Sequence, residues 1–157
     1  MSTAKASVVL DAQVSAAERL WYDLQRWPSF VDGFAHVAKL EGDWPDAGAR
    51  LIWNSTPDGR GRVSERVTSY IVRSGQSSEV EDERIEGVQH VRFRPREGGG
   101  CTMELELDYR LKGGNALTPV VNALFVRRAF RESLRRTLVR FKRELAFDVE
   151  LEAGSSL

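Results

Sequence analysis

The sequence is poor in the residues that build disulfide-bonded or metal-bound frameworks. Its 157 residues include one cysteine, Cys101, and two histidines, His36 and His90. One cysteine excludes a disulfide within the chain, and two histidines exclude a histidine-rich metal site. The chain also lacks His-Glu-x-x-His, Cys-x-x-Cys, P-loop and Gly-x-Gly-x-x-Gly motifs. We therefore expect a cytoplasmic protein with no metal, no cofactor and no residue that a catalytic motif identifies.

Net charge and long apolar runs are missing as well. The chain has 23 basic and 23 acidic residues, so its formal charge is zero and nothing favours nucleic acid as a partner. No stretch approaches the roughly 20 apolar residues that span a bilayer, and the polar start lacks a signal peptide's apolar segment. We expect no nucleic-acid partner and no integral membrane association. Of the basic residues 19 are arginine, a bias that we attribute to the base composition of a bacterial genome.

Length and composition are those of one globular domain. A hydrophobic fraction of 41% in 157 residues is enough for a core without disulfides or metals. We expect a single ligand-binding domain over residues 6–147, with flexible tails at 1–5 and 148–157.

Periodicity and turn residues predict one strand, two short helices, six more strands and a long helix. The expected strands are Ser7–Val14, Ala35–Glu41, Ala49–Ser55, Gly61–Arg73, Ser78–Ile85, Val88–Pro95 and Cys101–Lys112. The expected helices are Ala16–Leu24, Pro28–Val31 and Thr118–Phe147. Ser15 and Glu18 form a capping box before the first helix, and Thr118 is a good N-cap for the last. Short links between the strands favour antiparallel pairing.

The last strand and the long helix are the clearest elements. Every second residue from Cys101 to Leu111 is apolar or cysteine, so one face of this strand is buried and the other solvated. The helix carries an apolar stripe of its own. That stripe comprises Val120, Ala123, Arg127, Phe130, Leu134, Leu138, Phe141 and Leu145. A half-apolar sheet must be covered, and only this helix is long enough to cover it.

The run from Asp23 to Val31, Asp-Leu-Gln-Arg-Trp-Pro-Ser-Phe-Val, resembles a signature of the START-like, helix-grip (SRPBCC) superfamily. That superfamily includes the polyketide cyclase/dehydrase and lipid-transport family. Asp11-Ala12, Gly48-Ala49-Arg50-Leu51 and the glycine-rich turn before Cys101 are similar too. The resemblance implies an α+β helix-grip fold in β-α-α-β6-α order, with a seven-stranded antiparallel sheet curved around the C-terminal helix. It also implies a cavity between the two, but no catalytic motif, since the matching residues are structural.

Arg127 and Glu65 are the polar residues that the patterns place inside. Arg127 falls within the apolar stripe of the long helix, and Glu65 shares a parity with Val63 and Val67. A buried guanidinium needs a partner, so we hypothesise that the two meet in the cavity and bind the polar end of a ligand. A purely structural salt bridge, or an Arg127 that extends to solvent, is the alternative.

Further ligand contacts are expected from apolar and aromatic side chains on the inner faces. The candidate cavity walls are Trp53, Phe93, Met103, Tyr109, Phe130 and Leu134. Core packing explains each of them equally well, although Trp53 and Tyr109 add a polar group. We expect Cys101 to be a buried structural thiol and His36 and His90 to have structural or exposed roles.

The outer face of the long helix raises the question of a partner. Val121, Phe125 and Val139 lie off the apolar stripe, so a second copy of the chain, a membrane surface or the loop at 113–115 would cover them. The helix is rich in arginine, whereas the segment Glu79–Glu86 is acidic. These opposed charges either balance on the surface or mark a docking site.

Three functions remain open at this point. The first is a binding or carrier protein for a small hydrophobic or amphipathic ligand such as a lipid, a quinone or a polyketide-like aromatic molecule. The second is a cyclase/dehydratase-like or hydrolase-like enzyme that uses Glu65, Tyr109 or Arg127 as acid, base or oxyanion stabiliser. The third is a module that docks on a macromolecule through the basic helix.

Overall fold

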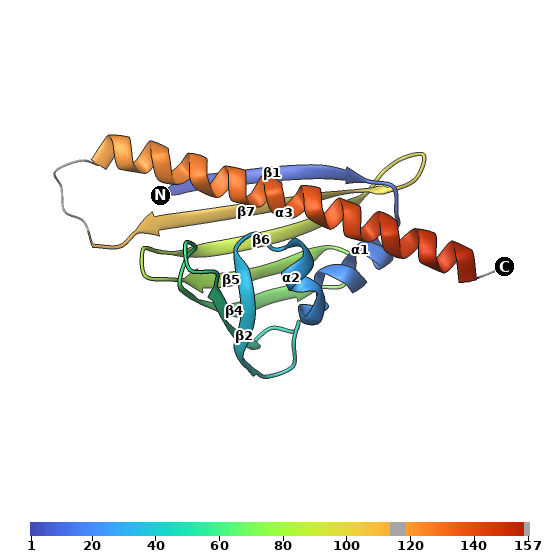
Figure 1. The fold of residues 1–157 in the computed structure, drawn as a ribbon, viewed down its shortest axis with the longest axis horizontal. Helices are drawn as coiled ribbons and strands as arrows, with labels where there is room; N and C mark the ends of the chain where they lie inside the picture. Colours follow the sequence, from blue (N-terminus) through green and yellow to red (C-terminus); the bar gives the residue numbers. More distant parts are fainter. Residues whose placement is uncertain (114–118, 156–157) are drawn as a thin grey trace.

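The computed structural model describes residues 1–113 and 119–155 (Figure 1). Its strands are β1 (Ser2–Leu10), β2 (Phe34–Glu41), β3 (Arg50–Ser55), β4 (Arg62–Ile71), β5 (Gly75–Glu81), β6 (Ile85–Pro95) and β7 (Cys101–Leu111). Its helices are α1 (Val14–Trp21), the 3-10 turn η1 (Leu24–Arg26), α2 (Trp27–Phe30) and α3 (Pro119–Ser155). None of the helices in this part of the chain combines the length and apolarity needed to cross a bilayer.

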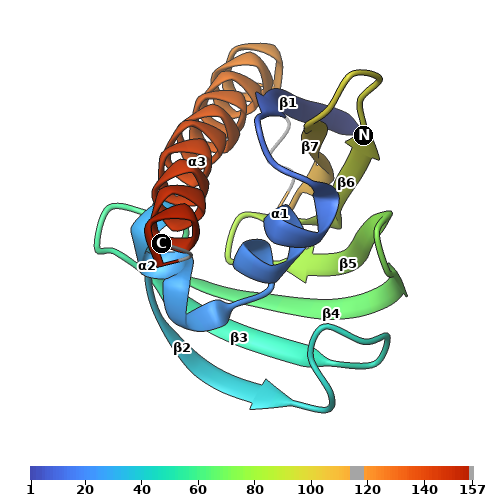
Figure 2. The same cartoon turned by 90° about the vertical axis from the view of Figure 1, so that its right-hand side faces the viewer.

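The seven strands form one antiparallel sheet in the order β1-β7-β6-β5-β4-β3-β2. The sheet curves strongly, and α3 lies along its inner side, with α1 and α2 near one end (Figure 2). Within the described ranges, only the β1–β7 pair joins strands that are far apart in the sequence, and it pairs Ser2 with Tyr109 and Leu10 with Cys101. The expected helix-grip architecture is confirmed.

Alternation along the strands decides which face α3 covers. On β7, Cys101 and each second residue to Tyr109 are at most 1% exposed, and the residues between them are half-buried. Each fully buried side chain of this size contributes roughly 1.5–3 kcal/mol to folding. Cys101 is one of them, and burial raises the pKa of its thiol. This confirms the expected structural thiol.

Several boundaries differ from the expectation. The expected strand Ser78–Ile85 is instead β5 (Gly75–Glu81), and β6 begins at Ile85 rather than at Val88, because the turn lies at residues 82–84. β1 begins at Ser2 rather than at Ser7, because Ala4 and Ala6 continue the inward pattern with small side chains that are easily overlooked. α1 begins at Val14, with Gln13 as its N-cap, so the predicted capping box does not form. Glu18 instead accepts hydrogen bonds from the main-chain and side-chain nitrogens of Arg73. α3 continues to Ser155, eight residues beyond the expected end at Phe147.

The core beneath α3 has two parts. The packed half comprises the buried Leu138, Phe141 and Leu145 of α3, the buried residues of α1 and α2, and the sheet residues that they cover, such as Phe93 and Met103. Phe141 lies 5.1 Å from Phe30 and 5.8 Å from Trp21, measured between ring centroids, in edge-to-face geometry.

The polar half lies beneath the preceding turns of α3, where Val126, Phe130 and Leu134 pack against Tyr109 and its neighbours but stay partly exposed.

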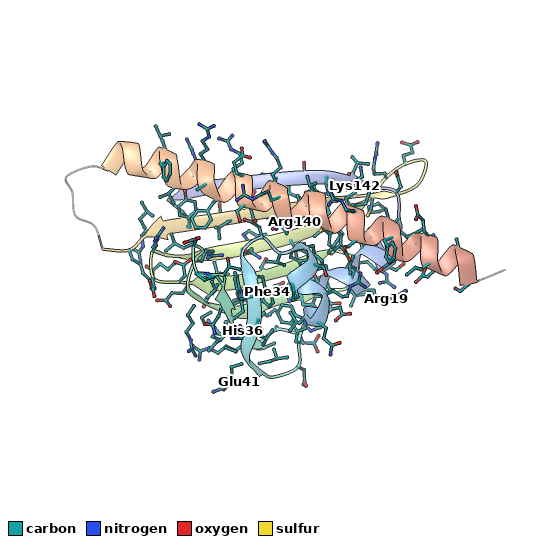
Figure 3. All side chains as sticks on the ribbon, viewed as in Figure 1. Arg19, Phe34, His36, Glu41, Arg140 and Lys142 are labelled. Carbon is teal, nitrogen blue, oxygen red and sulfur yellow. The ribbon has the colours of Figure 1, made fainter. Side chains whose placement is uncertain are left out.

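Ion pairs fix α3 to the short helices. Arg26 donates hydrogen bonds to Glu144 and Asp148, and Asp32, just after α2, accepts from Ser133, Arg136 and Arg140. Figure 3 labels Arg140 and Lys142 on α3, and Arg140 is the one of the two that reaches Asp32. Part of the basic character of this helix is therefore neutralised within the fold.

Candidate functional site

A group of polar side chains faces inward in the polar half of the core. We call it the polar cluster, and it comprises Trp53, Arg60, Glu65, Asp82 and Tyr109. Trp53 lies on β3, Glu65 on β4 and Tyr109 on β7. Arg60 and Asp82 lie in the turns that follow β3 and β5. The register places Glu65 and Tyr109 in the same row of the sheet, three strand spacings apart, since Glu65 pairs with Val80, Val80 with Gly87, and Gly87 with Tyr109.

Arg60 is the cation of this cluster. Its Nε donates to Asp82 Oδ2 over 2.7 Å, and its guanidinium carbon lies 5.9 Å from the Trp53 ring centroid and 5.3 Å from that of Phe130. Arg60 therefore bridges the sheet and α3 through a salt bridge and two cation–π contacts. Its Nη2 is buried but has no hydrogen-bond partner among the described residues. A polar ligand atom is one group that would satisfy it.

Glu65 supplies a buried carboxyl group. Trp53 Nε1 donates to Glu65 Oε2 over 2.8 Å. Burial raises the pKa of Glu65, and the Trp53 hydrogen bond and the charge of Arg60 oppose that shift without cancelling it. A carboxyl group in such a site takes up a proton more readily than it would in water, and in its protonated form it can donate a hydrogen bond as well as accept one.

Tyr109, on β7, is the remaining member of the polar cluster. Its ring lies 5.0 Å from that of Phe130, and its hydroxyl is buried without a hydrogen-bond partner in the described part of the chain. Burial raises the pKa of this hydroxyl, whereas the neighbouring side chain of Ser2, which is not in good hydrogen-bonding geometry with it, and the charge of Arg127 lower it by less. Two inward polar atoms, Tyr109 Oη and Arg60 Nη2, are thus left unsatisfied by the described residues in the same half of the core.

Several inward-facing residues of the polar half are partly exposed. Val126, Phe130 and Leu134 are half-buried although they face the sheet. Gln89, which pairs with Ser78 and Leu107 on the inner face, is half-buried too. By contrast, Leu138, the next residue of the stripe, is 2% exposed.

The predicted pair of Arg127 and Glu65, both described residues, is not found. Arg127 is exposed on α3, and the guanidinium that acts on Glu65 belongs to Arg60. The hypothesis that Arg127 points into the interior is therefore wrong, and the alternative, an Arg127 that extends to solvent, is what the structure shows, because Val126, one residue earlier, faces the sheet. Arg127 lies at the rim, close enough to influence Tyr109 electrostatically.

The other predicted site residues divide between the two halves. Glu65, Trp53, Tyr109, Phe130 and Leu134 face the interior, as their parity and spacing predicted.

Phe93 and Met103 are 3% and 0% exposed within the packed half, where core packing accounts for them. Arg60 was missed because a turn has no periodicity from which the direction of a side chain follows.

The remaining candidates lie outside the core. His36 is exposed on β2 beside Asn54 (Figure 3). Phe125 and Val139 are 73% and 52% exposed, as expected, while the side chain of Val121, the residues 114–115 and the predicted cap Thr118 lie outside the described residues.

The surface hollows described next lie away from the polar cluster. One of about 430 Å³ lies on the outer face of the sheet and includes Arg50, Arg66 and Glu79 in its lining. Another, of about 100 Å³, separates α1 from the C-terminal turns of α3. The predicted cavity between the sheet and the long helix stays a prediction. The outer face also carries a group of metal-binding type, His90, Glu106 and Asp108.

Known structures share this architecture. The Zhui aromatase/cyclase from Streptomyces sp. R1128 superposes with a TM-score of 0.78 at 12% identity, over 94% of this chain and 95% of that chain. The protein TTHA0849 from Thermus thermophilus has a TM-score of 0.70 at 18% identity, over 94% and 99%. Norcoclaurine synthase from Thalictrum flavum, in complex with dopamine and hydroxybenzaldehyde, has a TM-score of 0.68 at 11% identity, over 92% and 86%. At these identities the likeness establishes the fold alone.

Sequence comparison identifies the family. No curated protein sequence matches the chain. One family model, however, matches residues 1–146, which is nearly the whole chain and includes every described strand. The chain belongs to the family described as polyketide cyclase / dehydrase and lipid transport.

Proposed function

We propose that the chain binds a small amphipathic molecule, such as a lipid, a quinone or a polyketide-like aromatic compound, between the polar half of the sheet and α3. The observation that carries the proposal is that two of the three buried side-chain atoms left unsatisfied by the described residues, Arg60 Nη2 and Tyr109 Oη, lie beside the half-exposed apolar stripe of α3; the third is Tyr22 Oη. Family membership supports the same class of ligand.

The apolar part of the ligand would lie against α3. Val126, Phe130 and Leu134 retain accessible apolar surface that a ligand would remove from water, worth roughly 25 cal/mol per Å². Phe130 is the central residue of this stripe and contacts both Tyr109 and Arg60. Loss of its ring would remove the most contact area.

The polar part of the ligand would lie against the polar cluster. Arg60 Nη2 is a charged donor, and the Tyr109 hydroxyl both donates and accepts. Asp82 and the Trp53 and Phe130 rings hold the guanidinium in place, so little side-chain entropy is lost on binding. A ligand with an anionic or carbonyl end is the best match to this arrangement.

Two fluorescent probes of similar shape test the proposal. Anilinonaphthalene sulfonate carries an anionic group, and N-phenylnaphthylamine is its uncharged counterpart. We expect both to bind and Phe130→Ala to weaken both at least about tenfold, which corresponds to about 1.4 kcal/mol. Arg60→Gln is expected to weaken the sulfonate probe more than the uncharged one.

Phe125→Ala is the matched control, because Phe125 is on the same helix but faces solvent at 73% exposure. It should leave both affinities unchanged. Wild-type protein that binds neither probe, or equal losses in the Phe125 and Phe130 variants, would contradict the proposal. Native mass spectrometry of freshly purified protein adds an independent readout, since a retained small molecule would identify the ligand.

A second candidate function is cyclisation and dehydration of a bound poly-β-ketone. The favouring observation is the fully buried Glu65, whose raised pKa suits a proton donor to a departing hydroxyl group. In such a step an enol carbon attacks a carbonyl carbon and the enol proton passes to the carbonyl oxygen. The new hydroxyl group then leaves as water with a proton from Glu65, and the neighbouring carbon returns a proton as the carbon–carbon double bond forms. Incubation with a poly-β-ketone thioester, followed by mass spectrometry, would detect the loss of water. Glu65→Gln should abolish that product but retain probe binding, whereas absence of product with wild-type protein would leave binding as the sole function.

A further inference from the structure

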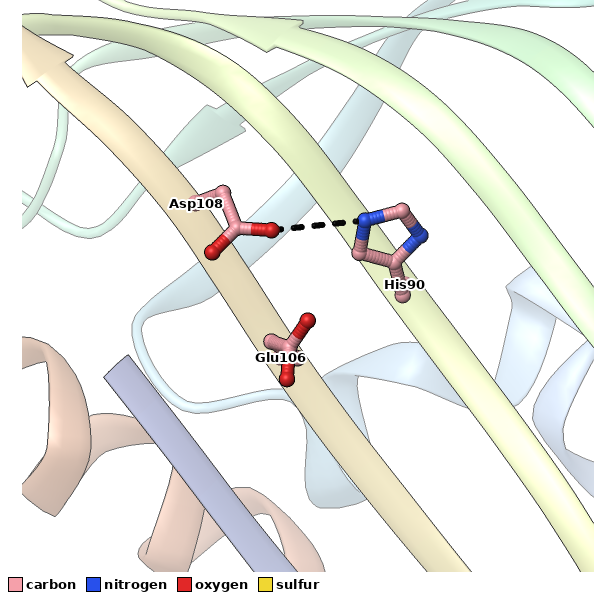
Figure 4. A group of neighbouring side chains, drawn as sticks. All are labelled: His90, Glu106 and Asp108. Carbon is pink, nitrogen blue, oxygen red and sulfur yellow. Dashed lines mark ion pairs between the residues drawn. The ribbon is translucent and has the colours of Figure 1, made fainter. Parts of the chain in front are cut away.

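Three side chains of metal-binding type converge on the outer face of the sheet, opposite α3. His90 comes from β6, and Glu106 and Asp108 come from alternate positions of β7 (Figure 4). One ligand atom of each lies within 4.8 Å of the other two. Metal–nitrogen and metal–oxygen bonds are about 2.0–2.2 Å long, so ligand atoms around one ion are at most about 4 Å apart. Small side-chain rotations would close this group around a cation.

The side chains of His90, Glu106 and Asp108 are partly exposed, and a hydrogen bond fixes the orientation of Asp108. The exposed fractions are 22% for His90, 28% for Asp108 and 16% for Glu106. Thr3 Oγ1 donates to Asp108 Oδ1 over 2.6 Å, which leaves Oδ2 facing His90 at 3.5 Å from Nε2. The carboxylate is thus oriented from one side while its second oxygen is available to bind an ion.

The imidazole of His90 is oriented from the far side as well. Ser77 Oγ lies 2.7 Å from His90 Nδ1. When Nδ1 carries the proton and donates it to Ser77, the lone pair of Nε2 faces the two carboxylates. Three groups that only accept then point at one another, which a cation relieves. A polar partner on the second ring nitrogen is the usual support of a metal-binding histidine.

The charged neighbours of the three side chains leave an excess of negative charge that a bound cation would compensate. Lys5 and Arg92 contact Glu106 at 3.3 and 3.5 Å, but each lies closer to Glu104, at 3.2 and 2.9 Å. Glu104 is therefore the main partner of both cations. The three carboxylates of this patch, Glu104, Glu106 and Asp108, outnumber its two cations, Lys5 and Arg92, by one.

We propose that His90 Nε2, Glu106 and Asp108 bind a divalent transition-metal ion such as Zn²⁺ on the outer face of the sheet. One imidazole and two carboxylates suit Zn²⁺, with water completing the coordination. Ser77 and Thr3 are positioning residues for this site. The site is separate from the proposed ligand site, so failure of either proposal leaves the other standing.

Isothermal titration of the untagged full-length protein with Zn²⁺ tests the site, and Co²⁺ absorption reports its coordination. We expect one saturable site that His90→Ala weakens about 100-fold or more. Ser77→Ala, which removes only the support of the ring, should weaken binding about tenfold. Lys5→Ala removes a competing cation and should tighten binding several-fold, an effect that a purely structural role would not produce.

The chain offers close controls. His36→Ala removes the other histidine, and Glu79→Gln removes another carboxylate of the same face, so neither should change Zn²⁺ affinity. Glu106→Gln and Asp108→Asn keep the side-chain shape, so they carry the test if His90→Ala fails to fold. No saturable binding by wild-type protein, unchanged affinity in His90→Ala, or an equal loss in His36→Ala would overturn the proposal.

Discussion

Phe130 and Phe141 are the same residue type on the same face of α3, eleven positions apart, yet their surroundings differ. Phe141 is fully buried against Trp21 and Phe30, whereas Phe130 is half-buried between Tyr109 and Arg60. The Phe141 environment is aromatic and aliphatic, whereas the Phe130 environment contains a half-buried guanidinium and an unsatisfied hydroxyl. One helix therefore closes a solid core with its later turns and borders a polar, partly accessible region with its earlier turns.

That difference separates stability from binding. Well-packed apolar contacts in the packed half hold α3 on the sheet, with further support from Arg26 and Asp32. The polar half contributes less to folding, because its apolar residues are incompletely buried and its polar atoms incompletely paired. The apolar surface and the polar atoms of this half that folding leaves unused are therefore available to contact a ligand.

The largest effect is expected from truncation in the packed half. Phe141→Ala should lower the free energy of unfolding by about 3–5 kcal/mol, since it opens a cavity among aromatic rings that cannot collapse. Phe130→Ala should cost about 1–2 kcal/mol because its ring is already partly in water. Urea denaturation of both variants measures the difference. Equal losses would show that the two halves are packed alike.

The second effect concerns Asp82, whose carboxylate accepts hydrogen bonds from Arg60 Nε and from the main-chain nitrogens of Arg84 and Ile85. Asp82→Ala leaves the guanidinium and the two amides without this partner, so we expect a loss of about 2–4 kcal/mol. Asp82→Asn retains acceptors and should cost less. Thermal unfolding compares the two variants, and an Ala variant as stable as the wild type would exclude a structural role for this ion pair.

The third effect is a dependence of stability on pH that has opposite signs for two carboxyl groups. The raised pKa of Glu65 means that the folded protein binds this proton more tightly than the unfolded chain does. Its stabilising contribution is complete below the ordinary value of 4.5 and is lost as the pH rises through the folded value. Glu65→Gln should therefore flatten the decrease in stability over that window.

Asp32 should behave in the opposite way. Burial alone would raise the pKa of Asp32, but hydrogen bonds from Arg136 and Ser133 and the charges of Arg136 and Arg140 lower it overall. Its contribution is present above the ordinary value of 3.8 and is lost as the pH falls through the folded value. Asp32→Asn should remove this acid-side loss, and denaturant titrations between about pH 3 and 8 would detect both slopes. A Glu65→Gln variant with the wild-type slope would contradict the burial of an ionisable group there.

The smallest effect is expected on the outward side of α3. Phe125→Ala should change the free energy of unfolding by less than about 0.5 kcal/mol, because 73% of this side chain is exposed. Chemical denaturation at several protein concentrations checks this. A larger, concentration-dependent loss would show that a second copy of the chain covers Phe125.

The fold could be predicted from the sequence because its signals are local. Alternation along β7 separates two faces, and the Asp23–Val31 run has the pattern of the helix-grip superfamily. The inward direction of Glu65 followed from its parity with Val63 and Val67 on one strand. Where a side chain belongs to a regular element that lies on the core, periodicity was a sufficient guide.

The polar cluster could be predicted only in part. Arg60 follows a strand, in a turn, so its direction depends on tertiary contacts with Asp82 and Phe130. Arg127 was placed inward by a stripe drawn along the whole helix, but Val126 faces the sheet in the earlier turns. The outer His90 group was missed for a related reason, because neighbouring strands bring its members together without a fixed spacing in the sequence.

Nuclear magnetic resonance of the isotope-labelled protein, titrated with N-phenylnaphthylamine, addresses the division of the core into two halves. Binding in the polar half should shift the signals of residues 123–134, Arg60 and Tyr109, while the amides around Phe30 and Phe141 keep their positions. Shifts confined to the packed half or to the outer face of the sheet would contradict a ligand site beneath the first half of α3.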